Sequence, residues 1–151
     1  MEFLSILREP VTFHLIIAAF LGSLLGLERE LARKDPSLRT FMLIALGSCA
    51  FSIISIHTAL DLGSLRSDPG RIAAQIVVGI GFLGAGSIFR SRDRIMGLTT
   101  AALMWVTAAI GMAVGFDRFD VAFKTTIVAL SFMILLNLLH QLLRYLFPDK
   151  E

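Results

Sequence analysis

A chain of 151 residues would ordinarily form one soluble domain, but 56% of these residues are hydrophobic and the mean hydropathy is +0.78. Only 17% are charged, and they fall in short clusters between long apolar runs, which excludes an ordinary soluble protein and is typical of a membrane protein. The net charge of +2 is too small and too scattered for a nucleic-acid surface. The single cysteine, Cys49, excludes an intrachain disulfide.

The chain contains several apolar stretches long enough to cross a bilayer as helices. We expect five spans, over residues 11–27, 40–60, 72–89, 98–116 and 125–143. The predicted fold class is therefore an all-α, multi-pass bundle of five transmembrane helices that forms a single domain over residues 1–151. Of the 14 lysines and arginines, nine fall on the side that carries the C-terminus and five on the other. This bias predicts that the N-terminus lies outside and the C-terminus inside.

A charged cluster, Glu28-Arg29-Glu30, directly follows the first span. It could simply end the span. Since Arg39 begins the next span on the same side of the membrane, a functional ion pair between Glu28 and Arg39 is the alternative.

The second and third spans begin alike, with Asp35-Pro36 and Asp68-Pro69. An aspartate can cap the first amides of a helix while proline occupies the first turn. The functional alternative is a polar site on one helix face that contains Asp68, Arg71 and Gln75, each about one turn apart.

The third span is rich in glycine. It matches the dinucleotide fingerprint G-x-G-x-x-G by coincidence, because the fingerprint requires a preceding strand and a later acidic residue. Glycines at these positions favour close helix packing, which predicts that the third span is the most buried helix, while local unwinding around an ion is the alternative. The packing glycines are Gly79, Gly81, Gly84 and Gly86 here, Gly22 and Gly26 in the first span, and Gly111 and Gly115 in the fourth.

Polar side chains also occur within the spans. Trp105 lies near the middle of the fourth span, so we expect its indole N–H to find a partner inside the bundle. Thr99 and Thr100, at the start of that span, are candidates for a polar seam. In the fifth span Asn137 and His140 are one turn apart and suit contacts between helices. His14 and His57 are expected to face lipid headgroups.

The central part of each predicted span contains no Asp, Glu, Lys or Arg, although ion pathways normally carry such a residue there. Nor does any histidine stand where it would activate a nucleophile. We therefore expect no enzyme, no cofactor and no bound metal.

Several motifs, taken together, resemble one family. They are Gly22-xxx-Gly26-Leu27-Glu28-Arg29-Glu30, Leu38-Arg39-Thr40, Ala45-Leu46-Gly47-Ser48, Asp68-Pro69-Gly70-Arg71-Ile72-Ala73-Ala74-Gln75, Gly79 to Gly86, and Gly97-Leu98-Thr99-Thr100-Ala101-Ala102 through Trp105 to Gly111. In this order they resemble the MgtC/SapB family of bacterial inner-membrane proteins. The resemblance implies a five-span domain, a location in the inner membrane and a role in adaptation to low magnesium and, in pathogens, in virulence. Many members continue into a soluble C-terminal domain, whereas this chain ends at Glu151.

Three classes of function follow. A non-catalytic regulator of membrane energetics or transport is favoured by the resemblance and by the lack of charges within the spans. A small cation transporter or channel subunit is the alternative, and a membrane enzyme is the least favoured. The expected partners are the lipid bilayer and other membrane proteins, with a second copy of the chain left open and nucleic acid excluded.

Overall fold

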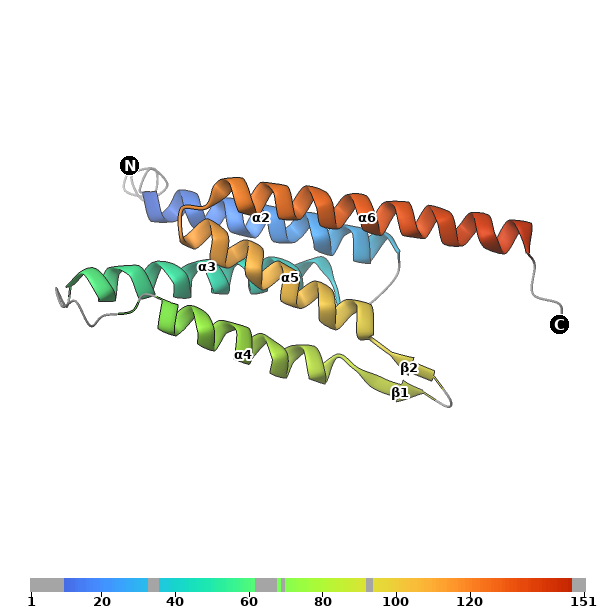
Figure 1. The fold of residues 1–151 in the computed structure, drawn as a ribbon, viewed down its shortest axis with the longest axis horizontal. Helices are drawn as coiled ribbons and strands as arrows, with labels where there is room; N and C mark the ends of the chain where they lie inside the picture. Colours follow the sequence, from blue (N-terminus) through green and yellow to red (C-terminus); the bar gives the residue numbers. More distant parts are fainter. Residues whose placement is uncertain (1–9, 33–35, 62–67, 69, 92–93, 148–151) are drawn as a thin grey trace.

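The computed structural model describes residues 10–32, 36–61, 68, 70–91 and 94–147. In this part of the chain it contains five helices and one small antiparallel hairpin (Figure 1). The helices are α2 (Pro10–Leu31), α3 (Leu38–Asp61), α4 (Gly70–Gly86), α5 (Leu98–Gly115) and α6 (Phe119–Leu146), and the strands are β1 (Phe89–Ser91) and β2 (Arg94–Met96).

Four of these helices, α2, α3, α5 and α6, are long and apolar enough to cross a membrane. Their side chains explain why, since apolar residues cover nearly the whole circumference and lipid leaves the backbone no partner outside its own helix. The fifth helix, α4, is also apolar but has only 17 residues. It packs along α3 and α5.

The most buried helix is α5. Of its apolar 18-residue stretch 50% is buried inside the bundle, against 28% for the corresponding stretches of α2 and α3 and 6% for that of α6. It contacts all four other helices (Figure 1). The expectation that the third predicted span would be the most buried helix is therefore wrong, because α4 buries only Ala73, Ile80 and Gly84.

Close backbone approach at glycine explains the central place of α5. A Cβ atom on Gly115 would lie 2.6 Å from the carbonyl oxygen of Cys49 on α3, and one on Gly111 would collide with the backbone of Ala45. Helix α2 approaches α3 in the same way, since a Cβ on Gly22 would lie 2.7 Å from the carbonyl oxygen of Phe41. Small residues at helix interfaces permit this spacing. The packed core therefore comprises α2, α3 and α5.

The glycines of α4 have different surroundings. A Cβ on Gly79, Gly81 or Gly86 would meet no atom within 4 Å, and one on Gly84 would make only ordinary contact with Ala101. Helix α4 is continuous through this run, so the alternative of local unwinding is also wrong.

The third predicted span ends earlier than expected. The helix stops at Gly86, and Phe89 belongs to β1, which pairs with β2 in the register Phe89 with Met96. The Ser87 hydroxyl donates to the carbonyl oxygen of Gly84 at 2.7 Å and so satisfies a carbonyl at the helix end. Hydropathy alone could not detect this change, because Ile88 and Phe89 continue the apolar run.

The other boundaries differ mainly where charged residues continue a helix. Helix α2 extends through Glu28-Arg29-Glu30 to Leu31, and α6 begins at Phe119, six residues before the predicted start. The charged cluster therefore does not end the helix. We call the end of the bundle with the hairpin, the last turn of α2 and the start of α5 the hairpin end.

Candidate functional site

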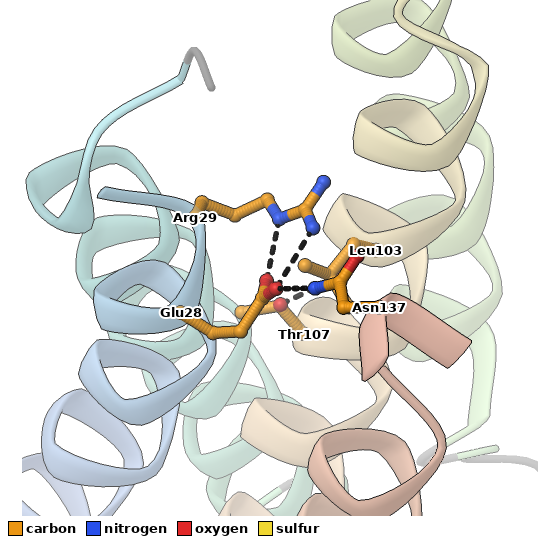
Figure 2. A network of polar contacts seen from close by, with 5 residues as sticks. All are labelled: Glu28, Arg29, Leu103, Thr107 and Asn137. Carbon is orange, nitrogen blue, oxygen red and sulfur yellow. Dashed lines mark hydrogen bonds and ion pairs between the residues drawn. The ribbon is translucent and has the colours of Figure 1, made fainter. Parts of the chain in front are cut away.

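A polar cluster lies between α2, α5 and α6 towards the hairpin end (Figure 2). Its side chains are Glu28 and Arg29, which are adjacent on α2, and Asn137 on α6, with Thr107 of α5 beside them. The Arg29 side chain is 3% exposed and that of Glu28 is 11% exposed. The cluster is therefore a buried charge pair in an apolar bundle.

Every oxygen of the Glu28 carboxylate accepts a hydrogen bond. Arg29 Nε donates to Oε2 at 2.7 Å, and Arg29 Nη2 donates to Oε1 at 3.1 Å. Asn137 Nδ2 donates to the same Oε1 at 2.8 Å. The forked guanidinium contact neutralises the charge of the Glu28 carboxylate. The Asn137 amide, 109 positions along the chain from Glu28, connects α6 to α2. A buried ion pair without such added bonds would be costly, so this geometry is what makes burial tolerable.

Thr107 of α5 lies beside Glu28, but its hydroxyl bonds the backbone of its own helix. Its hydroxyl donates to the carbonyl oxygen of Leu103 at 2.8 Å, as threonine in a helix commonly does. It takes no part in the hydrogen bonds that Arg29 and Asn137 donate to the carboxylate.

The predicted Glu28 to Arg39 pair is wrong, because Glu28 pairs with its neighbour Arg29 while Arg39 is exposed on α3. Glu30 has a different role. Its carboxylate Oε2 accepts from the Leu38 amide at 3.2 Å and so caps the start of α3. Asp35, the predicted cap for that helix, lies outside the described residues.

The second predicted polar set does not join this cluster. Asp68 Oδ1 accepts from the Gly70 amide at 2.8 Å, so its carboxylate caps α4 at the far end of the bundle. Arg71 and Gln75 are both exposed. Gln75 borders an apolar groove of about 560 Å³ between α3 and α4. Of the two threonines at the start of α5, Thr100 is buried and Thr99 is exposed.

Trp105 also differs from the prediction. It is 54% exposed on the outer surface of α5, so the expectation of an indole partner inside the bundle is wrong. A large amphipathic ring can face lipid at such a position.

A second ion pair, at the end of the bundle opposite the hairpin, was not expected. His14 Nε2 lies 2.8 Å from Asp117 Oδ1, and His14 Nδ1 lies 2.6 Å from the carbonyl oxygen of Pro10. The ring is 16% exposed and packs against Phe119, so the expectation that His14 faces headgroups is wrong. Asp117 has φ of 60°, a left-handed conformation that aspartate tolerates better than most residues. Only tertiary structure brings these residues together, so no local pattern could have revealed the pair.

A helical bundle with apolar outer surfaces, four helices long enough to span a bilayer and one buried charge cluster defines a multi-pass membrane protein. Comparison with known proteins makes the class more specific. The model of the MgtC family matches residues 15–142, and the chain belongs to this family.

The relatives cover most of this chain. It is 44% identical over 132 residues to YhiD of Escherichia coli K12, which bears the provisional name of a magnesium transporter, with 85% of this chain and 60% of that protein covered. It is 44% identical over 131 residues to Protein MgtC of Salmonella typhimurium LT2, with 87% of this chain and 54% of that protein covered. The chain thus spans little more than half the length of these relatives. No solved structure matches it.

Proposed function

We propose that this chain is a non-catalytic membrane protein that regulates membrane energetics or transport during adaptation to low magnesium. The single observation that carries the proposal is the fully bonded Glu28 carboxylate. A Mg²⁺ ion needs oxygen ligands and usually binds one or two carboxylates together with its own waters. At Glu28 it would meet a guanidinium that already holds both oxygens and repels cations.

The same cluster supports a positive role. Glu28 and Asn137 connect α2 to α6, and Arg29 fixes the carboxylate between them. In an apolar bundle such a contact fixes the relative position of two helices, since polar groups have few other partners. We infer that α6, which is exposed over most of its length, is held in one position by the cluster and presents its outer face to a partner membrane protein.

The proposal places the chain in the bacterial inner membrane, with five helices spanning the bilayer in one domain, N-terminus outside and C-terminus inside. Family membership and the distribution of basic residues support this arrangement. A transporter of magnesium is the alternative function, supported by the name of the YhiD relative.

Growth of a bacterial strain that lacks its own family member tests the role of the cluster. We expect the wild-type chain to restore growth at low Mg²⁺, and Glu28→Ala and Asn137→Ala to fail although they reach the membrane in normal amounts. Gln75→Ala is the control, because Gln75 is exposed on α4, a helix that contributes no residue to the cluster, and it should behave as wild type. Full activity of both cluster variants would contradict the proposal.

A further inference from the structure

A cavity of about 680 Å³ lies at the hairpin end of the bundle. It is bordered by the end of α2, Pro36, the end of α4, the hairpin and the start of α5. The side chains around it are largely apolar and include Phe89, Ile95, Met96, Leu98 and Met104. Among the described residues that line it, Arg29 is the one with a charged side chain.

Arg29 is almost completely buried, yet its guanidinium reaches this cavity. Arg29 donates to Glu28 through Nε and Nη2, so the carboxylate binds one edge of the planar guanidinium. Figure 2 shows the remaining nitrogen, Nη1, directed away from Glu28. A guanidinium carries five N–H donors in a fixed plane, and this pairing leaves the Nη1 edge outside the carboxylate contact. The ion pair thus pre-orients a cationic donor group at the cavity wall.

The start of α5 adds a second set of donors to the same wall. Gly97, the residue before the helix, has φ of 88°, and a Cβ there would collide with the carbonyl oxygen of Ser87, so glycine is required. Gly97 makes no side-chain cap hydrogen bond, and the first turn of α5 contains no acidic residue. The first amides of a helix have no partner within it and carry the positive end of the helix dipole. Leu98 and Thr99, which supply such amides, both line the cavity.

A cationic edge and a helix start beside five apolar side chains suit an anion that carries an apolar body. We propose that this cavity binds an anionic phospholipid, with its phosphate on the Arg29 edge and the start of α5 and its glycerol and upper acyl chain against Ile95, Met96 and Leu98. Helix N-termini and arginine are both suited to phosphate. The site goes beyond the proposed regulatory function and does not depend on it.

Binding of defined lipids to the purified full-length chain in detergent tests the proposal, with native mass spectrometry and lipid-dependent thermal stabilisation as readouts. The probes are phosphatidylglycerol, zwitterionic phosphatidylcholine and inorganic phosphate. We expect tighter binding of phosphatidylglycerol than of phosphatidylcholine, and no displacement by millimolar phosphate, because free phosphate lacks the apolar contacts.

Two variants test the cavity independently. Arg29→Lys keeps a positive charge for Glu28 but removes the second edge of the fork, and should weaken phosphatidylglycerol binding about tenfold, the scale of one charge-assisted hydrogen bond. Ile95→Trp fills the cavity without touching the ion pair and should weaken binding by a similar factor. Its matched control is Ile127→Trp, because Ile127 on α6 is 62% exposed and Ile95 is 63% exposed.

Unchanged binding in Ile95→Trp, or equal binding of the two lipids, would overturn the proposal. Complete displacement of phosphatidylglycerol by inorganic phosphate would show that the site binds free phosphate and not a phospholipid. Should Arg29→Lys fail to fold, the comparison of Ile95→Trp with Ile127→Trp still tests whether the lipid binds in the cavity.

Discussion

Asn137 is the only side chain that α6 contributes to the polar cluster among the described residues, and it donates directly to a buried carboxylate. Asn137→Ala leaves Arg29 to neutralise Glu28 but removes this bond. We expect a loss of about 1 kcal/mol of folding stability, the usual range for one side-chain hydrogen bond within a membrane bundle. Thermal unfolding in detergent measures the change. His140→Ala, one turn further along the same helix and exposed, should change stability by less than about 0.5 kcal/mol. Equal effects would show that the bond to Glu28 contributes nothing.

The contacts of His14 predict a dependence of stability on pH. Each ring nitrogen faces an acceptor, the Pro10 carbonyl oxygen or the Asp117 carboxylate. A neutral imidazole donates through one nitrogen only, whereas the protonated ring donates through both. The stabilisation should therefore be complete at low pH and decline as pH rises through the range of about 5 to 8 in which histidine usually loses its charge.

Asp117→Asn tests this dependence, because asparagine also tolerates the left-handed backbone at this position. We expect the variant to lose much of the difference in melting temperature between pH 5.5 and pH 8. Asp120→Asn is the control, since Asp120 is exposed and contacts Arg118 and Lys124 and not His14. A profile in Asp117→Asn that matches wild type would refute the assignment.

At the scale of helices, the glycines that the sequence predicts to pack closely fall into two groups in the structure. Gly111 and Gly115 of α5 contact the backbone of α3, whereas Gly81 of α4 has open space where a Cβ would be. Gly111→Ala should therefore separate α5 from α3 and cost about 1 to 3 kcal/mol, the range for overpacking a core. Gly81→Ala should be neutral or stabilising by up to about 1 kcal/mol, because alanine favours helix. Chemical denaturation measures the change in folding stability of each variant. Comparable destabilisation of the two would contradict the division of the glycines into packed and open positions.

Sequence reasoning predicted the helices well and their contacts poorly. Long apolar runs must be helical in lipid, so the existence of all five helices followed from composition, whereas the hairpin of β1 and β2 did not. The glycine run at 79–86 predicted a buried α4, but glycine permits close approach without specifying which neighbour approaches. The Glu28 and Arg29 pair was visible as a cluster, yet its bond to Asn137 depends on the tertiary placement of α6. Asp68 followed the local rule for a cap, because capping needs only neighbouring residues.

For the whole molecule, the arrangement predicts which surface positions share a side of the membrane. Ser91 in the hairpin lies at one end and Arg118 in the turn before α6 lies at the other. Cysteines placed at these positions should react with an impermeant thiol reagent from opposite sides, with Ser91→Cys cytoplasmic. The native Cys49 is buried and should contribute little background. Labelling of both positions from the same side would contradict the bundle, and an outward Ser91 would reverse its orientation.

The central claim is that the buried carboxylate serves to hold helices together and does not carry a cation. The most direct test is Mg²⁺ uptake into liposomes that contain the purified chain, followed with an enclosed Mg²⁺-sensitive dye and compared with liposomes containing Glu28→Gln. Since Arg29 and Asn137 already occupy the Glu28 oxygens, we predict uptake at the level of protein-free liposomes for both proteins. Uptake that requires the wild-type chain and disappears in Glu28→Gln would contradict the account and assign the cluster to a transport pathway.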